Sequence, residues 1–174
     1  MDKTSFIAVI EISCVIQHRS NYKYNLINEE RQMYKLVVWV MIKKDEEILL
    51  LKKPDNSEWT LAGGHVEDNE SLKDAAIRTV KAETSIELDY ASLDLLCIID
   101  REMDSGYKLH AFFKATQWHG ELNNNEPDVH SEIKWHKLNS LPENLGALAS
   151  SAVKSVNTGD FYYFENSPNK HNKH

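Results

Sequence analysis

The chain has 174 residues, of which 41% are hydrophobic and 27% are charged, proportions that fit one globular domain with a single core. The formal net charge of −7 at pH 7 argues against a polyanion-binding surface, because affinity for a phosphate backbone comes mainly from clustered Lys and Arg. Nucleic acid polymers and anionic membranes are therefore not expected as partners.

The cysteines and the N-terminal stretch favour a cytoplasmic location. Cys14 and Cys97 form no CxxC pair and no disulfide framework, so both are expected to be small buried hydrophobic residues in a reducing compartment. The apolar stretch 6–16 is interrupted by Glu11, and no small-residue cleavage site follows it, which disfavours a signal peptide. This stretch is also too short to span a bilayer.

The first predicted elements are strands. Residues 1–33 hold one strand candidate and then a polar run, and they are interpreted as an N-terminal extension. From residue 34 the pattern becomes β-like, with a strand over 34–42, a polar turn and a second strand over 47–51. These two strands are expected to form a hairpin.

A helix is predicted to begin near Ser71. Gly63 and Gly64 precede it, and Ser71 and Asp74 have the spacing of a capping box. The apolar row of this helix, at i, i+4 spacing, consists of Leu72, Ala76 and Val80.

The second half of the chain predicts a mixed α/β order. Strands are predicted over 93–99, 109–116 and 133–136, and a closing helix over 145–158 is stopped by Gly159. The last residues lack periodicity and are expected to be disordered. The expected organisation is an extension at 1–33, one domain at 34–164 and a disordered tail at 165–174.

From Gly64, the sequence GHVEDNESLKDAAIRTVKAETSI resembles the Nudix box, a loop-helix-loop motif. The motif runs Gly, five residues, Glu, seven residues, then Arg-Glu-aliphatic-x-Glu-Glu-x-Gly-aliphatic. The matching positions are Gly64, Glu70, Arg78, Val80, Glu83 and Ile86. The three departures are Thr79, Ala82 and Ser85, which replace Glu, Glu and Gly. The resemblance extends over about residues 34–164 and implies a Nudix fold, a mixed β-sheet sandwiched between helices (α/β/α).

Such a box holds a diphosphate against a divalent metal while water attacks phosphorus. Mg²⁺ prefers carboxylate, carbonyl and water oxygens, so helix carboxylates at i, i+3 and i+4 make a compact metal platform. In this chain these positions are Thr79, Ala82 and Glu83, and only Glu83 supplies negative charge. Reduced hydrolysis is therefore expected.

The resemblance also assigns roles to individual residues. Glu83, Arg78 and Glu70 are the expected catalytic-site residues, with the Glu70–Arg78 pair tying the loop to the helix. The expected metal ligands are the backbone carbonyl of Gly63, Glu67 as a substitute ligand, Glu83 and Glu126. The expected ion is Mg²⁺, with Mn²⁺ as the alternative. Glu83 and Glu126 should then meet at one cavity mouth beside Gly63.

Each candidate has an ordinary structural alternative. Glu83 and Arg78 could be solvated surface residues of a charged helix, and Glu126 could belong to a solvated loop. Trp59 and Phe112 are candidates for stacking on a nucleobase, although core packing would explain both. The histidines lack the spacing of a zinc site and are expected to be hydrogen-bonded bystanders: His65, His110, His119, His130 and His136.

The resemblance implies a pyrophosphohydrolase that cleaves a nucleoside diphosphate linked to another group, with a small-molecule nucleotide as its partner. The alternatives are a regulatory nucleotide-binding domain that no longer hydrolyses, and a scaffold whose pocket is vestigial. A homodimer stays open. The subgroup acting on ADP-ribose has a proline about sixteen residues after the box, and this chain has none there, which disfavours that subgroup.

Overall fold

The computed structural model describes residues 34–55, 57–103 and 106–165. The predicted N-terminal extension, Cys14 and tail residues 166–174 lie outside these ranges. The elements of the described part are β1 (Tyr34–Lys44), β2 (Glu47–Lys52), β3 (Trp59–Thr60), β4 (Ala62–His65), α2 (Leu72–Thr84), β5 (Glu87–Leu88), η1 (Tyr90–Ser92), β6 (Leu93–Met103), β7 (Gly106–Ala115), β8 (Trp118–His119), β9 (Glu132–Lys137), α3 (Ala147–Thr158) and β10 (Tyr162–Glu165).

Strand β1 organises the main sheet. It pairs in parallel with β7 and antiparallel with β4, and its last residues turn into the antiparallel partner β2. Strand β6 is antiparallel to β7, and β10 is parallel to β6. Val38, Val40 and Ile42 are buried on one face of β1 and Met41 on the other, which explains its nearly continuous apolar sequence.

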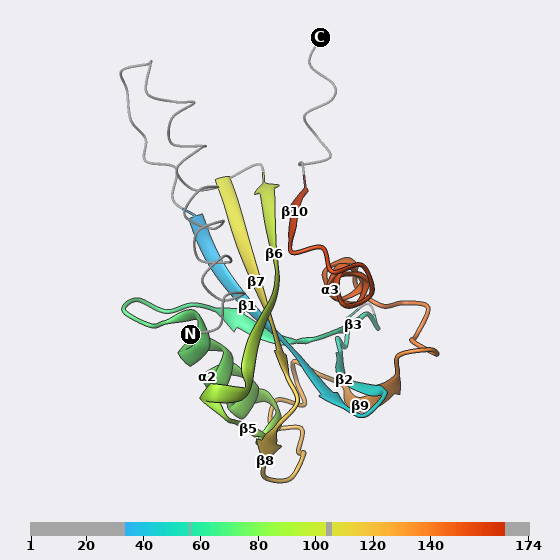
Figure 1. Cartoon of the computed structure of the whole chain (residues 1–174). Coiled ribbons are helices and arrows are strands. Elements are labelled where there is room, and N and C mark those ends of the chain that lie inside the picture. The colour runs from blue at the N-terminus through green and yellow to red at the C-terminus, as the bar shows by residue number, and fades with distance from the viewer. Residues whose placement is uncertain (1–33, 56, 104–105, 166–174) are drawn as a thin grey trace, which may run out of the picture. The chain divides into compact units, whose positions relative to one another are not determined.

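The two α-helices of the described residues cover opposite faces of this sheet (Figure 1). Helix α2 lies against β4 and β1, and α3 lies against β6. The core beneath α3 joins Ala149 and Ala152 to residues of five strands, among them Met41, Ile99 and Phe112. The predicted α/β/α arrangement is therefore confirmed.

The start of α2 agrees with its predicted cap. Ser71 is the N-cap, and its side chain accepts a hydrogen bond from the Asp74 amide. Helix α3, by contrast, begins two residues later than predicted. The backbone of Leu145 bridges to Trp59, and the Gly146 amide donates to the Trp59 carbonyl at 2.8 Å, so these residues extend the edge of β3 instead of entering the helix. Gly159 ends α3 in the left-handed conformation, as predicted.

Strand β10 is absent from the sequence interpretation. Its four residues pair with β6, more than sixty residues earlier in the chain, from Tyr162 opposite Ile98 to Glu165 opposite Arg101. Glu165, which the sequence interpretation places in the tail, is therefore the last residue of a strand, and its side chain forms an ion pair with Arg101 at 3.3 Å.

Candidate metal centre

The loop between β4 and α2 is fixed by the expected Glu70–Arg78 pair. Arg78 donates from Nε and Nη2 to the two carboxylate oxygens of Glu70 at 2.7 and 2.8 Å, and from Nη2 to the His65 carbonyl at 3.0 Å. The hydrogen bond from Arg78 is the main reason why the pKa of Glu70 falls from 4.5 to about 2. The Glu67 carboxylate lies 3.4 Å from the same guanidinium. The Glu70–Arg78 pair therefore holds the loop in position. Glu67 forms an ion pair with the same arginine.

Glu83 lies in the last turn of α2 and is buried, with 7% of its surface exposed. One carboxylate oxygen accepts a hydrogen bond from the Gly63 amide at 3.1 Å, and the other lies 3.2 Å from Nε2 of His130. Burial raises the pKa of Glu83, and repulsion by Glu126 adds to this, whereas the contacts with His130 and Gly63 oppose it. Glu83 is thus a buried carboxylate and not the solvated surface residue of the alternative interpretation.

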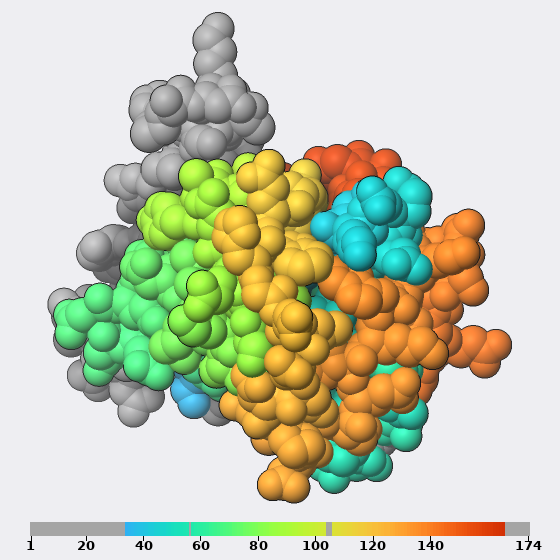
Figure 2. All heavy atoms as spheres, turned by 90° about the horizontal axis from the view of Figure 1, so that it is seen from below, coloured from blue at the N-terminus to red at the C-terminus, as the bar shows by residue number. Residues whose placement is uncertain are grey.

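The loop 119–131, which we call the capping loop, docks on the C-terminal end of α2. The amides of Asn123 and Asn125 donate to the carbonyls of Thr84 and Glu83, at 3.0 and 3.1 Å. The Asn125 side chain also donates to the Lys81 and Ala82 carbonyls, at 3.3 and 3.1 Å. The capping loop thereby satisfies carbonyls that a helix end leaves without internal partners. Figure 2 shows this orange segment beside the green surface to which α2 contributes.

Docking of the capping loop brings Glu126 and His130 to Glu83. The His130 amide donates to the Glu126 carbonyl at 2.8 Å, and Asn124 donates from its side chain to the His130 carbonyl at 2.6 Å. One ligand atom from each of Glu83, Glu126 and His130 lies within 4.8 Å of the other two. Glu83 and Glu126 thus converge near Gly63 as predicted, while the cavity mouth expected at this point stays a prediction.

His130 is the member of this cluster that the sequence interpretation treats as a bystander. Its side chain is 5% exposed and belongs to the loop, so no strand or helix periodicity marks it. The available signal is its position four residues after Glu126, which places both residues in one turn. Glu67 is not a member of the cluster. Its assignment as a ligand, like that of the Gly63 carbonyl, stays a prediction.

The NUDIX domain family model matches residues 33–156, well over half of the chain. The chain belongs to the Nudix family. It is 31% identical over 109 residues to the CTP pyrophosphohydrolase of Escherichia coli, an alignment that covers 60% of this chain and 71% of that protein. It is 28% identical over 105 residues to the uncharacterized Nudix hydrolase YvcI of Bacillus subtilis. That alignment covers 58% of this chain and 65% of YvcI, so the chain spans slightly less than two thirds of that relative.

Solved Nudix structures share the fold. The crystal structure of a MutT NUDIX hydrolase from Burkholderia pseudomallei matches with a TM-score of 0.65 and 28% identity, covering 71% of this chain and 98% of that chain. The crystal structure of a MutT protein from Bacillus halodurans matches with a TM-score of 0.65 and 25% identity, covering 77% of this chain and 91% of that chain. The described helices include none long and apolar enough to cross a membrane.

The two positions of the Nudix box that have lost a glutamate differ in their surroundings. Thr79 is buried, and its Oγ1 has no hydrogen-bond partner in the described part of the chain. A Cβ on Gly64 would lie only 2.9 Å from that oxygen, so the backbone passes close over Thr79. Ala82 is exposed. A longer side chain therefore has room at position 82 and very little at position 79.

The expected base-stacking residues lie in the hydrophobic core of the Nudix domain. Phe112 is fully buried and Trp59 is 6% exposed, and both belong to the core cluster beneath α3. Core packing accounts for both, and their contact with a base stays a prediction. Trp39 is more accessible: it is half-buried, stacks on His110 and Phe112, and lies close against Gly63. It is therefore an aromatic surface next to the residue that contacts Glu83.

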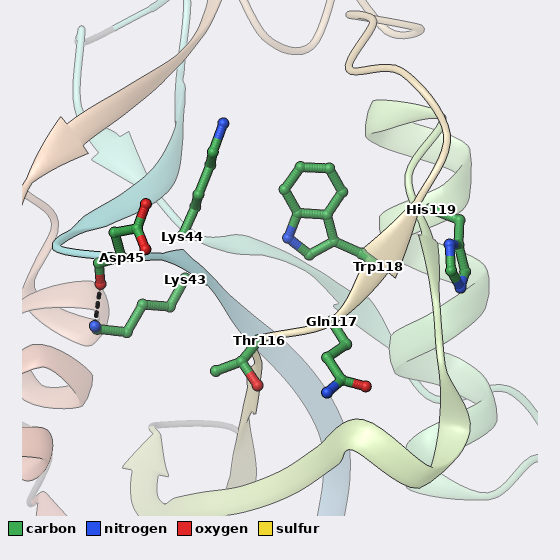
Figure 3. A pocket seen from close by; sticks show the side chains of 7 residues that line it. All are labelled: Lys43, Lys44, Asp45, Thr116, Gln117, Trp118 and His119. Atoms are coloured by element: carbon green, nitrogen blue, oxygen red, sulfur yellow. Dashed lines mark hydrogen bonds between the residues drawn. The ribbon is translucent and has the colours of Figure 1, made fainter.

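A separate open pocket of about 630 Å³ lies between the β1–β2 turn and the segment from the end of β7 into β8 (Figure 3). It is lined by Lys43, Lys44, Asp45, Thr116, Gln117, Trp118 and His119. Lys43 is already engaged, with the Asp45 carbonyl and with Glu46. None of the cluster residues lines this pocket. The candidate site is therefore placed at Glu83, where a buried carboxylate, a partly buried carboxylate and a buried imidazole meet.

Proposed function

We propose that this chain is a metal-dependent pyrophosphohydrolase that cleaves a nucleoside diphosphate linked to another group. The observation that carries this proposal is the convergence of Glu83, Glu126 and His130, whose ligand atoms lie within 4.8 Å of one another. The cluster compensates in part for the missing box carboxylates, because the capping loop contributes one carboxylate and one imidazole. Reduced activity is expected, because positions 79 and 82 supply no charge.

The donor set fits a divalent cation. Glu83, which is buried, and Glu126, which is partly buried, bring two carboxylates together, and their like charges repel unless a cation lies between them. When bound, a divalent ion would neutralise charge on the diphosphate and on the transferring phosphoryl group. Glu83 and Glu126 would hold the ion, and the Gly63 amide would keep the Glu83 carboxylate in one orientation. Mg²⁺ is the ion expected from the family resemblance, with Mn²⁺ as the alternative.

Arg78 and Glu70 have a positioning role in this proposal. Both carboxylate oxygens of Glu70 are engaged by the guanidinium, and one of them also accepts from the Glu67 amide at 3.0 Å. This arrangement fixes the loop that precedes α2. The reacting diphosphate would therefore meet a preorganised backbone, which lowers the entropic cost of aligning it for attack by water.

The substrate class follows from the family and from one aromatic surface. A nucleoside triphosphate is a nucleoside diphosphate linked to a further phosphate, and the name of the Escherichia coli relative records CTP as its substrate. Trp39, half-buried beside Gly63, offers a ring on which a base can stack. Nucleoside triphosphates, CTP among them, are therefore the first substrates to test, and Trp59 and Phe112 stay as further candidates for base contact.

A nucleotide-binding domain without hydrolysis is the second candidate function. The loss of two box carboxylates favours it, because the fold and the loop geometry survive while part of the charge platform does not. In that case a nucleotide would bind and remain intact.

The test is a hydrolysis screen over a panel of nucleotides with Mg²⁺ or Mn²⁺, with the product nucleoside monophosphate and nucleotide binding measured in parallel. Glu83→Gln should lower kcat at least a hundredfold, a barrier change of about 2.7 kcal/mol. The control Glu121→Gln removes an exposed carboxylate of the capping loop outside the cluster and should leave kcat unchanged. Binding without turnover would replace the hydrolase proposal by the nucleotide-binding one. Absence of both would leave the scaffold interpretation.

A further inference from the structure

The cluster differs chemically from the all-carboxylate platform that the Nudix box would supply. Two of its donors are carboxylates, Glu83 and Glu126, and the third is the imidazole of His130. Oxygen donors suit Mg²⁺ and Mn²⁺, whereas imidazole nitrogen suits Co²⁺, Ni²⁺ and Zn²⁺. The identity of the third donor therefore bears on which metal the site prefers.

The backbone at His130 is held in place by hydrogen bonds on both sides. The His130 amide donates to the Glu126 carbonyl at 2.8 Å, and its carbonyl accepts from Asn124 at 2.6 Å. The next amide, that of Ser131, donates to the Lys52 carbonyl at 2.9 Å. These bonds join the capping loop to β2 and fix the backbone from which the ring reaches Glu83.

The ring nitrogens are arranged so that Nε2 can become a ligand. Nε2 lies 3.2 Å from Glu83, and Nδ1 has no hydrogen-bond partner in the described residues although the residue is 95% buried. A neutral imidazole carries one proton, which can reside on either nitrogen. In the tautomer with the proton on Nδ1, Nε2 presents its lone pair to the cluster, and the only hydrogen bond given up is the one with Glu83.

A second buried group on the same face of α2 also lacks a partner. Thr79 lies one helical turn before Glu83, so the two side chains share a face of the helix. Its hydroxyl oxygen is buried and has no hydrogen-bond partner in the part of the chain that the structure describes. Buried polar groups are usually satisfied, so an unpartnered hydroxyl one helical turn from Glu83 indicates that a ligand or its water belongs there.

We propose that His130 Nε2, Glu83 and Glu126 form a mixed nitrogen and oxygen site that selects a transition cation of the Co²⁺, Ni²⁺ and Zn²⁺ class over Mg²⁺. Three protein ligands leave coordination positions open for water and for substrate oxygen. This inference rests on the proposed function only for the place of the metal, and cation binding tests it without any turnover.

The main experiment is calorimetric titration of the full chain with Co²⁺ and separately with Mg²⁺. His130→Gln should weaken Co²⁺ binding at least tenfold, or about 1.4 kcal/mol, and change Mg²⁺ binding less than twofold. Glu83→Gln should weaken the binding of both cations. His119→Gln removes an exposed imidazole of the same loop outside the cluster and should change neither.

Two further controls make the result specific. His171 and His174 near the C-terminus can bind transition cations by themselves, so every titration is repeated in an H171Q/H174Q background. Should His130→Gln fail to fold, nitrogen NMR of the unaltered chain replaces it. One buried histidine ring nitrogen should then shift stoichiometrically with Zn²⁺ and not with Mg²⁺.

The outcomes separate this inference from the proposed function. Equal loss of Co²⁺ and Mg²⁺ affinity in His130→Gln, or no loss of either, overturns the inference, because His130 then only positions Glu83 or plays no part. If His130→Gln leaves hydrolysis with Mg²⁺ unchanged and has no selective effect on Co²⁺ binding, the inference fails while the proposed function is retained. Selective Co²⁺ binding without turnover of any nucleotide supports the inference and removes the hydrolase proposal.

Discussion

The side-chain amide of Asn125 lies across the end of α2, with Nδ2 3.1 Å from the carbonyl oxygen of Ala82. The same nitrogen reaches the Lys81 carbonyl, and Ser85 donates from its hydroxyl to Oδ1 of Asn125 at 2.9 Å. The residue after Asn125 is the cluster carboxylate Glu126. Asn125 is therefore a positioning residue, because it fixes the loop against the helix at the point where the two segments bring their ligands together.

Replacement of Asn125 by alanine should destabilise the fold by about 1 kcal/mol, since exposed carbonyls lose protein donors but regain water. The free energy of metal binding should also become weaker, by more than the loss of folding stability, because the backbone next to Glu126 is no longer fixed against α2. Chemical unfolding and cation titration measure the two effects. Asn123→Ala is the matched control: its side chain makes one long contact, 3.4 Å to the Glu121 carbonyl, and both measurements should stay near those of the unaltered chain. Equal effects of the two substitutions would contradict the positioning role.

Charge can be restored to the Nudix box at one position more easily than at the other. Ala82→Glu should be tolerated, at a cost of about 0.5 to 1 kcal/mol, because the site is exposed but lies near the negative end of the helix dipole. Thr79→Glu should cost about 1 to 3 kcal/mol or more, because Gly64 leaves no space above Thr79. If the missing carboxylates limit the rate, Ala82→Glu should raise hydrolysis at least tenfold. Ala82→Gln, which adds the same bulk without charge, should not. Equal rates in these two variants would show that charge at position 82 is not limiting.

His110 should make the fold sensitive to mild acid. Burial lowers its pKa to about 4, with help from the charges of Arg101, Lys108 and His65. Trp39 donates from Nε1 to His110 Nδ1 at 3.0 Å, a bond that needs the neutral ring. The unfolded chain binds the proton near pH 6.5 and the folded chain only near pH 4, so stability is lost as the pH falls between these values. The full shift corresponds to about 3 kcal/mol.

Unfolding measured at pH 7 and at pH 4.5 tests this expectation. His110→Gln keeps an acceptor for the Trp39 ring but cannot titrate, so the drop in its unfolding free energy should be smaller than that of the unaltered chain. If the unfolding free energy of His110→Gln fell between pH 7 and pH 4.5 as much as that of the unaltered chain, other groups would cause the acid sensitivity.

Glu70 should contribute at more acidic pH. Its pKa falls from 4.5 to about 2 mainly through the hydrogen bond from Arg78, so its contribution is complete above pH 4.5 and is lost as the pH falls through about 2. Glu70→Gln should lower the free energy of unfolding at pH 7. It should also reduce the further loss of stability between pH 4.5 and pH 2, which we call the acid limb of the stability curve. Glu67→Gln, which alters a more exposed partner of the same guanidinium, should leave the limb in place. An unchanged limb in Glu70→Gln would show that the pair contributes nothing to it.

The helix and strand signals that were local could be predicted. Ser71 caps α2 through contacts with its near neighbour Asp74, and the apolar run of β1 reflects burial on both faces. Features that depend on distant partners could not. Strand β10 has four residues and pairs with β6, and the role of His130 arises only after the capping loop has docked on α2. The Nudix box predicted the position of Glu83, but not that the imidazole of His130 would contact it.

The hydrogen bonds from the capping loop to the end of α2 also determine how this region opens. The amide protons of Asn123 and Asn125 are bonded to helix carbonyls, so they should exchange with solvent only when the last turn of α2 is disrupted. Loop and helix end would then form one cooperative unit with a shared opening free energy. A fluctuation that frays this turn would scatter all three ligands at once, so cation release would be governed by local unfolding and not by the departure of a single side chain.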